Sequence, residues 1–512
     1  MKEYQWISWQ GLALGVCIAC CHTSLCFSAD HPQWGQPYTR NMISYETGLP
    51  DSFDPKSGQG IKWSVSLGRE AYGSPVVAGG RVLVGANNKK PRDPRYRGDR
   101  AVLLCLNESD GTLCWQLAVP RIAGGDIFKD WPNISMCSPP TVEGNRVYIL
   151  TNRVEVICLD LQGQRNGNDG FQDEAAYLTA PGESPVDVTL QDADLLWVTD
   201  LRKEVDMYPH DSAHASILID GDLLYLNSSN GVDKTHKTIQ RPDAPSLIVL
   251  NKNTGRCVAQ DGERIGPQIF HSTWSSPSMA TIHKKKQVIF AGGDGFVYGF
   301  EAIDNETKPQ PRAILKQLWR FDCDPDAPKK DVRSYQRNRK VSPTSISGMP
   351  VFHDNKIFLT AGGDIWWGKE TAWLLCIDAT QRGDVTRTAK LWSYPLQEHA
   401  VTTPSIHKGL VYAADCGGLV HCVDAETGKG VWTHQLKREI WGATLVADGK
   451  VYVGSRRGDF CILSASKDKR VLCTVQFDAP ISTTPVAANG VLYVATQERL
   501  YAIESLKKES ML

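Results

Sequence analysis

The sequence predicts an all-β protein, an eight-bladed β-propeller built of four-stranded antiparallel blades. The first observation is a repeat unit, clearest in TTPSIHKGLVYAADCGGLVHCVDAETGKGVW, residues 402–432. The second is its period, because Asp424, Ser464 and Glu504 end equivalent strands forty residues apart, about the length of four short strands and their turns. The third is composition: 44 glycines and 15 tryptophans against 7 methionines are typical of short strands joined by tight turns.

Eight copies of the unit follow one another along the chain. Each copy begins with small or hydroxylated residues ahead of an apolar strand, as in GSPVV at Gly73 and STTPVA at Ser482. A later strand of each copy ends at a polar residue, in order Asn107, Asp160, Asn251, Glu301, Asp378, Asp424, Ser464 and Glu504. An Asp or Asn at a strand end can cap its turn by accepting a hydrogen bond from the backbone two residues on, so we assign these residues to turns and not to catalysis.

Most copies also carry a tryptophan in their closing strand. These structural tryptophans are Trp63, Trp115, Trp197, Trp319, Trp392 and Trp432. A tryptophan placed between neighbouring blades buries about 150–250 Å² of surface. We therefore expect this set to hold the blades together.

The first and last copies are incomplete. The segment IKWSVSL at 61–67 looks like a closing strand with no unit before it, and the eighth unit ends without one. We predict that 61–67 is the outermost strand of the last blade, beside the hairpin at 491–504, which removes a free sheet edge. The propeller then spans residues 61–505, preceded by an extended segment at 30–60 that lies on the folded body and followed by a C-terminal tail at 506–512.

Residues 1–29 resemble a secretory signal peptide. Lys2 is followed by an apolar run from Gly11 to Ala19 and then by small residues up to Ala29. The run is too short to span a bilayer, so we expect no transmembrane span. We expect an exported monomer of the bacterial periplasm, with lipidation of Cys20 or Cys21 as the alternative to a free mature chain.

Charge and cysteine content narrow the function classes. The net charge is −1, which gives no global attraction to nucleic acid, and we expect no nucleic-acid partner.

Four cysteines outside the leader occupy one repeat position on different blades: Cys105, Cys158, Cys376 and Cys422. A disulfide needs its two Cα atoms within about 7 Å, so we expect these cysteines to be small buried apolar residues.

The repeat is similar to a known one. DAETGKGVW at 424–432 and NESDGTLCW at 107–115 resemble the tryptophan-docking repeat of quinoprotein propellers, whose enzymes use pyrroloquinoline quinone (PQQ). The resemblance covers residues 63–504 and implies the propeller fold. It implies two alternatives for function, because the same repeat builds PQQ-dependent dehydrogenases and the cofactor-free propeller lipoprotein of outer-membrane barrel assembly.

The dehydrogenase alternative implies features that this sequence does not match. Outside the leader there is no adjacent cysteine pair, and the chain has no CxxCH haem motif. No Glu, Asn and Asp set for calcium and no catalytic Asp can be assigned by the resemblance. PQQ with calcium is therefore the cofactor that the resemblance suggests, and we assign no cofactor.

Function is expected in long loops that depart from the repeat. Four of the twelve histidines lie between residues 210 and 271, in segments that should meet at the mouth of the funnel. The candidate ligand-binding residues there are His210, Asp211, His214, Asn230, Asp233, His236, His271 and Trp274. Imidazole and carboxylate groups can bind a transition metal or act as a general base. The alternative is that each of these residues caps its own loop, and we assign no metal.

A second candidate segment is AGGDIWWGKETAW, which interrupts the fifth unit with Asp364, Trp366 and Trp367. Adjacent aromatic side chains can stack on a planar ring or a sugar, or else cover the core of their own loop. Two basic loops, at 87–100 and 329–340, either are plain solvated loops or attract an anionic partner or surface.

The sequence thus predicts a binding or scaffold module that acts through its funnel-face loops on a protein partner or a small ligand. The alternative is a PQQ-dependent alcohol or sugar dehydrogenase, or another enzyme that uses a His/Asp funnel site. No catalytic residue is assigned.

Overall fold

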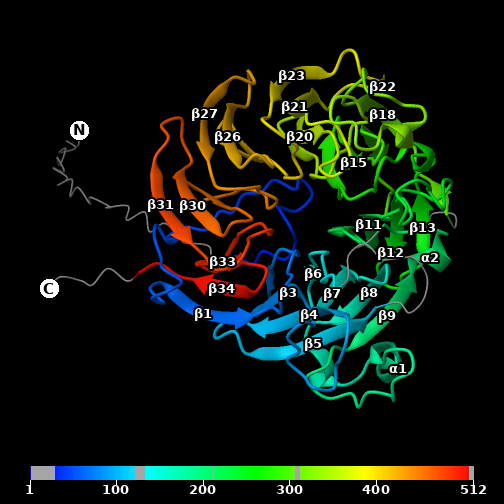
Figure 1. Cartoon of the computed structure of the whole chain (residues 1–512), viewed down its shortest axis with the longest axis vertical. Helices are drawn as coiled ribbons and strands as arrows, with labels where there is room; N and C mark the ends of the chain where they lie inside the picture. Colours follow the sequence, from blue (N-terminus) through cyan, green and yellow to red (C-terminus); the bar gives the residue numbers. More distant parts are fainter. Residues whose placement is uncertain (2–28, 122–132, 211–212, 306–311, 507–512) are drawn as a thin grey trace.

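The predicted propeller is confirmed. The computed structural model describes residues 1, 29–121, 133–210, 213–305 and 312–506. Its strands form eight sheets set as blades around a central axis (Figure 1). Six sheets have four strands, and the sheets of blades 3 and 4 each gain a short fifth strand that pairs in parallel at the outer edge.

We number the blades along the chain and give their strands from the innermost outwards. Blade 1 consists of β2 (Val76–Ala78), β3 (Arg81–Asn87), β4 (Arg100–Asn107) and β5 (Leu113–Pro120), and blade 2 of β6 (Thr141–Glu143), β7 (Arg146–Leu150), β8 (Glu155–Asp160) and β9 (Leu195–Asp200). Blade 3 consists of β10 (Leu218–Asp220), β11 (Leu223–Asn227), β12 (Leu247–Asn251), β13 (Cys257–Gln260) and β17 (Ala313–Ile314). Blade 4 consists of β14 (Ser278–Ile282), β15 (Lys285–Ala291), β16 (Phe296–Glu301), β18 (Gln317–Asp322) and β22 (Gly383–Asp384).

Blades 5 to 8 follow the same order. Blade 5 consists of β19 (Val351–His353), β20 (Lys356–Gly362), β21 (Ala372–Asp378) and β23 (Lys390–Pro395), and blade 6 of β24 (Ser405–His407), β25 (Leu410–Ala414), β26 (Leu419–Asp424) and β27 (Gly430–Gln435). Blade 7 consists of β28 (Leu445–Ala447), β29 (Lys450–Gly454), β30 (Asp459–Ser464) and β31 (Val471–Gln476). Blade 8 consists of β32 (Val486–Ala488), β33 (Val491–Ala495), β34 (Arg499–Ile503) and β1 (Ile61–Ser66).

The helices are short and lie in the loops. They are η1 (Gly163–Asn166), α1 (Glu174–Leu178), α2 (Leu201–Glu204), η2 (Gly266–Gln268) and η3 (Val332–Tyr335). In the part of the chain that the structure describes, no helix has the length and apolar character needed to cross a membrane.

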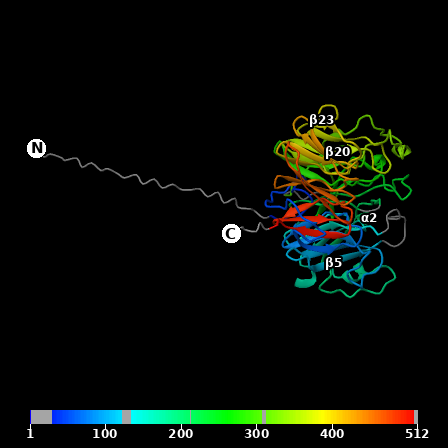
Figure 2. The same cartoon turned by 60° about the vertical axis from the view of Figure 1, so that its left-hand side comes forward.

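The ring closes through its two ends, as predicted. Strand β1 pairs antiparallel with β34, with Ile61 opposite Ile503 and Ser66 opposite Arg499. The blue N-terminal and red C-terminal strands accordingly lie side by side in both views (Figures 1 and 2). Blade 8 is therefore made from both ends of the propeller.

The polar residues at the strand ends form the expected turns. Asn107 Oδ1 accepts a hydrogen bond from the Ser109 amide at 3.1 Å, two residues on. Asp424 Oδ1 accepts from the amides of Glu426 and Thr427 at 3.2 and 3.0 Å. The third strands end at the predicted residues in seven blades, and β34 ends at Ile503, one residue before Glu504.

Tryptophans of the outer strands join neighbouring blades. Five indole NH groups donate to a backbone carbonyl in the turn of the next blade at 2.9–3.1 Å: Trp63 to Glu108, Trp115 to Leu161, Trp197 to Lys252, Trp392 to Ala425 and Trp432 to Ser466. The turn glycine lies against the ring, since a Cβ on Gly428 would meet the Trp392 ring at 2.6 Å. Trp319 differs, because its indole NH donates to Gln287 Oε1 within its own blade. The residues after Asp378 do not form a tight turn against Trp319. They form strand β22, which pairs with blade 4 beside Trp319.

Hydroxyl residues ahead of the inner strands link the blades at the axis. The Ser216 amide donates to Ser276 Oγ at 2.8 Å, and the Thr484 amide donates to Ser74 Oγ at 3.0 Å. The Ala443 amide likewise donates to Thr484 Oγ1 at 3.0 Å. These bonds satisfy backbone groups that have no partner within their own blade, which explains the small hydroxylated residues at the start of each unit.

Residues 31–46 cross the centre of the ring, and we call this segment the plug (Figure 1). It forms hydrogen bonds with residues of, or just ahead of, the innermost strand of every blade: Val77, Val142, Ser216, Met279, Phe352, Ile406, Val446 and Ala487. Most of these are the middle residues of their strands. The plug therefore closes the central channel below the loops that lead into the inner strands.

The cysteines after residue 29 are thiols. All eleven of them are free, and ten are buried. Those at the shared repeat position, Cys105, Cys158, Cys376 and Cys422, have no exposed surface. They act as small apolar core residues, as the sequence predicts.

Candidate functional site

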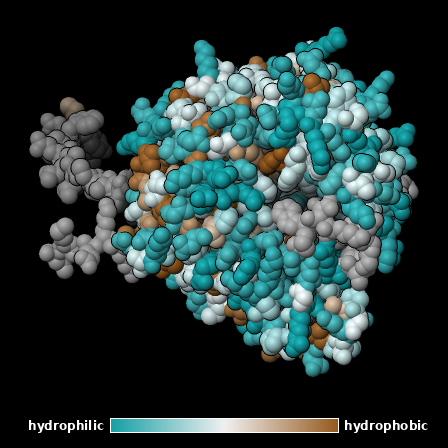
Figure 3. Space-filling view, viewed as in Figure 1, coloured by the Kyte–Doolittle hydropathy of each residue, from teal (hydrophilic) through white to brown (hydrophobic). Residues whose placement is uncertain are grey.

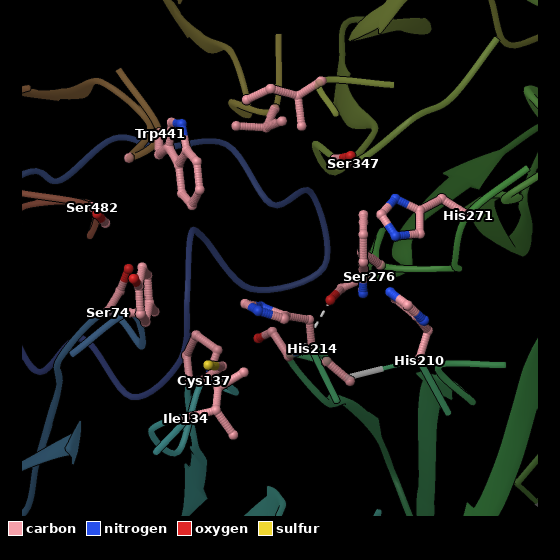
Figure 4. Close-up of a pocket in the computed structure, with 18 of the residues that line it drawn as sticks. Ser74, Ile134, Cys137, His210, His214, His271, Ser276, Ser347, Trp441 and Ser482 are labelled. Carbon is pink, nitrogen blue, oxygen red and sulfur yellow. Dashed lines mark hydrogen bonds between the residues drawn. The ribbon is translucent and has the colours of Figure 1, made fainter. Parts of the chain in front are cut away.

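A cavity of about 380 Å³ lies on the axis, and we call it the funnel pocket. All eight blades contribute to its wall through the loops before their inner strands, and Trp34 of the plug contributes as well. Figure 4 shows His210 and His271 on one side of this space, Trp441 on the opposite side and His214 between them. The Trp34 indole donates to Thr484 Oγ1 at 3.1 Å, which fixes this ring in the wall.

The structure brings most of the predicted site residues to this pocket. The lining includes His210, His214, His236, His271, Trp274, Trp366 and Trp367. Asp364 lies behind the wall in contact with His271, and Asp211 lies outside the described residues.

Asn230 and Asp233 are not part of the wall and hold its loops instead. Asn230 Oδ1 accepts from the Tyr208 amide at 3.1 Å, and its Nδ2 donates to the Arg241 carbonyl at 2.9 Å. Asp233 accepts from the Thr235 amide and from Gln240 Nε2 at 3.1 and 3.0 Å. These contacts shape the loop that carries His236.

Three histidines from three separate loops meet on one side of the funnel pocket. His210 precedes β10, His236 lies between β11 and β12, and His271 lies between η2 and β14. One ring nitrogen from each lies within 4.8 Å of the others, and the ring centroids are 4.5–5.4 Å apart. We call them the histidine cluster.

His210 is held by a backbone carbonyl. Its Nδ1 lies 2.9 Å from the Val232 oxygen, which can only accept, so Nδ1 carries the proton in the neutral ring. Burial, together with the neighbouring His271 and His236, lowers the pKa of His210 to about 3. The ring is therefore neutral at neutral pH, and its Nε2 keeps a lone pair.

His271 is held by a buried carboxylate. Its Nδ1 lies 2.9 Å from Asp364 Oδ2, while Asp364 Oδ1 accepts from the amides of Trp366 and Trp367 at 3.0 and 2.8 Å. Burial alone would raise the pKa of Asp364, but His271 and the two amides outweigh it and keep that pKa below its usual value. The Nε2 atom of His271 is buried and has no hydrogen-bond partner in the described part of the chain.

His236 sits in a strained loop clamped by the basic segment at 329–340. Its φ is 58°, a left-handed conformation that costs free energy in a residue other than glycine. The carbonyl of His236 accepts from Gln336, and its ring lies 4.7 Å from that of Trp367. The Arg337 guanidinium covers Trp367 at 5.1 Å.

Aromatic rings form the rest of the wall. Trp274, Trp366 and Trp441 follow one another edge to face, with centroids 5.6 and 6.0 Å apart. The Arg456 guanidinium lies 3.7 Å from the Trp441 ring centroid, and His271 lies 4.8 Å from Trp274. The wall thus combines a row of indoles with the histidine cluster, and the two adjoin where His271 contacts Trp274 and Trp366.

Sequence reasoning missed Trp441, Trp34 and Tyr72 as lining residues. A signal for Trp441 was present, because WGATLV places a large ring where the other units begin with small residues. Nothing comparable marks Trp34 or Tyr72, which lie outside the repeat unit. Their places depend on the path of the plug and of the segment after β1.

Comparisons with known proteins agree with this architecture. Solved structures similar to this chain include BamB from Moraxella catarrhalis, at 14% identity, covering 86% of this chain and 98% of that one, with a TM-score of 0.50. The computationally designed Ika8 protein matches at 11% identity, 87% and 100% coverage and a TM-score of 0.50. A europium-containing methanol dehydrogenase matches at 12% identity, 93% and 98% coverage and a TM-score of 0.43.

At such identities the first two likenesses show the fold alone. No curated protein matches the chain. A family model described as outer membrane protein assembly factor BamB matches residues 49–265, 316–453 and 416–509, well over half of the chain. The chain therefore belongs to this family of PQQ-repeat β-propellers.

Proposed function

We propose that this protein is an exported binding module whose funnel pocket takes up a small ligand with a flat apolar ring. The observation that carries the proposal is the row of indoles, Trp274, Trp366 and Trp441, along a channel closed by the plug. Aromatic faces bind flat rings by stacking and by burial of apolar surface. The leader-like sequence at 1–29 supports export.

The size of the pocket favours a small molecule, or a single inserted side chain of a partner, over a flat protein interface. Its volume of about 380 Å³ falls within the range of small-molecule sites, about 300–1,000 Å³. The face of the ring in Figure 3 carries mostly hydrophilic side chains, with apolar ones in separate small patches. Such a face lacks the broad apolar area of a permanent interface.

Charge favours an apolar ring as well. None of the described residues that line the pocket is Asp, Glu, Lys or Arg. Burial lowers the pKa of His214 to about 4, so it is neutral at neutral pH like His210. A neutral aromatic pocket selects ligands by shape and apolar surface.

Anilinonaphthalene sulfonate, a flat fluorescent probe, is expected to bind the mature protein at one site, and Trp366→Ala is expected to weaken that binding. Trp366 is 44% exposed and lines the pocket, so its removal takes away stacking surface at little cost to the core. The loss is about 2 kcal/mol, about 30-fold in Kd. Fluorescence titration measures it.

Leu391→Ala is the control, since Leu391 lies on β23 outside the pocket and is 48% exposed, close to the exposure of Trp366. Its probe affinity should equal that of the parent. Equal affinity in Trp366→Ala and the parent would show that the probe binds elsewhere and would refute the ring-binding proposal.

PQQ with calcium, the cofactor that the fold family implies, does not fit the residues in the described wall. Calcium takes six to eight oxygen ligands, mainly carboxylate and amide oxygens. The described lining offers ring nitrogens and hydroxyls, and both oxygens of Asp364 are taken by His271 and two backbone amides. We derive no redox step for this chain.

Calcium is accordingly expected to leave the affinity of the protein for PQQ unchanged. Without a carboxylate or amide side chain in the described lining, the ion lacks the oxygen ligands that it prefers beside the quinone. Equilibrium dialysis of PQQ with and without calcium, together with a dye-linked alcohol oxidation assay, makes the measurement. Calcium-dependent binding accompanied by dye reduction would instead support the dehydrogenase alternative.

A further inference from the structure

We propose that His210, His236 and His271 bind one divalent transition-metal ion in the funnel pocket, with Asp364 as the outer-sphere partner of His271. This inference goes beyond ring binding and stands apart from it, because the metal ligands and the indole wall are different side chains. It rests on the orientation, position and surroundings of the three rings.

The orientation of two rings makes their Nε2 atoms the candidate metal ligands, because Nδ1 is held by the protein in both. A metal-binding imidazole usually donates its other ring NH to a carbonyl or carboxylate, which fixes the tautomer. His210 Nδ1 is 2.9 Å from the Val232 carbonyl, and His271 Nδ1 is 2.9 Å from Asp364. Both rings already have the tautomer that a metal requires.

A buried nitrogen without a partner marks the position of the ion. His271 is 5% exposed, and its Nε2 has no hydrogen-bond partner in the described part of the chain. Such an atom costs free energy unless something binds it. The cluster brings one ring nitrogen from each of His210, His236 and His271 within 4.8 Å of the others.

The geometry needs only a small adjustment to hold a metal. Zinc–nitrogen bonds of about 2.0–2.1 Å in a tetrahedron place ligand nitrogens about 3.4 Å apart. His210 and His271 are buried, whereas His236 is half-buried at the edge of the pocket. We expect the half-buried His236 ring to make most of the adjustment when an ion binds.

The donor set selects the class of metal. Three neutral imidazoles suit zinc, copper, nickel or iron, while calcium and magnesium prefer oxygen ligands. Three protein ligands leave a further coordination position, and here it faces the cavity lined by Trp274 and Trp366. A bound ion would supply a Lewis acid at that position, where a water or an anionic ligand group can bind.

The test uses zinc and the full mature chain purified without a histidine tag. After treatment with a chelator and dialysis, the parent is expected to take up one equivalent of zinc, measured by elemental analysis and by competition with a chromogenic chelator. His271→Ala and His236→Ala should lose that equivalent. Cobalt should give the visible absorption of a four-coordinate site in the parent and not in these variants.

Asp364→Asn separates a metal role from a merely structural one. The amide can accept from His271 but carries no charge, so zinc affinity is expected to fall about 10- to 100-fold with one equivalent still bound at saturation. His353→Ala is the matched control, because His353 lies on β19 away from the pocket and pairs only with Asp354 at 3.3 Å among the described residues. Its zinc uptake should equal that of the parent.

Thermal unfolding of each variant shows which proteins are folded before zinc is compared. If His271→Ala does not fold, the half-buried His236 decides the question. Loss of the equivalent in folded His236→Ala supports the site. No zinc uptake by the folded parent, or full uptake by folded His236→Ala, overturns it.

Discussion

Replacing Trp63 by alanine is expected to lower the free energy of unfolding by about 3–5 kcal/mol, the usual cost of removing a large buried aromatic side chain. Trp63 is 8% exposed, donates its indole NH to the Glu108 carbonyl at 3.0 Å and packs 5.9 Å from the ring of Tyr493. The side chain thus joins blade 8 to blade 1. Urea unfolding followed by circular dichroism measures the loss.

The junction between blades 8 and 1 differs from the others in its covalent structure. In every other blade the four main strands follow one another in order along the chain before it enters the next blade. At this junction β1 runs directly into blade 1, so blade 8 is held to it through the pairing of β1 with β34. Replacing Trp63 therefore removes a buried indole and also weakens the closure of the circle of blades.

Trp432→Ala is the matched control for this effect. Trp432 makes the same bond to the next blade, to the Ser466 carbonyl at 2.9 Å, but between two blades connected in the ordinary way. We expect it to cost about 2–3 kcal/mol, less than Trp63→Ala, because Trp432 is only half-buried and because the ring of blades stays closed. An equal or larger loss in Trp432→Ala would show that closure adds nothing to the stability of blade 8.

The repeat could be predicted from the sequence because its rules are local. Asp424 caps a turn with its own neighbours, and Trp432 lies at a fixed distance beyond that turn, so both positions recur in other blades. The closing strand was predictable for the same reason. Trp63 marks 61–67 as a closing strand, and the last unit is the one that has no closing strand of its own. Trp319 departs from the rule because residues after Asp378 form an extra strand instead of the tight turn.

The candidate site was only partly predictable, because it depends on contacts between loops that follow no period. His210, His236 and His271 were singled out by their enrichment, but their convergence depends on three separate loops meeting. Asn and Asp are residue types that also bind metals and substrates. Only the hydrogen bonds that Asn230 and Asp233 accept from backbone amides show that these two residues hold the loop. The path of the plug cannot be derived from any repeat.

Arg40→Met is expected to destabilise the protein by about 3–5 kcal/mol and to loosen the plug. The Arg40 guanidinium is fully buried and donates to the Pro277, Trp34 and Ser216 carbonyls and to Ser216 Oγ, at 2.9–3.1 Å. Burial lowers its pKa to about 9, so it is still charged at neutral pH. Methionine keeps the apolar stem but leaves these buried acceptors without donors, at about 1–3 kcal/mol each before relaxation.

Arg40→Lys is the control, because lysine keeps the charge and the stem but lacks the planar fork that reaches several acceptors at once. We expect it to lose about half as much stability.

Urea unfolding gives the two values, and the anilinonaphthalene sulfonate titration gives a second measurement that connects the plug to the pocket. Arg40 holds the backbone of Trp34, whose ring lines the pocket, so Arg40→Met should weaken probe binding while the ring of blades stays folded. Unchanged stability and probe affinity in Arg40→Met would show that the plug is held by its backbone contacts alone and that the pocket does not depend on this guanidinium.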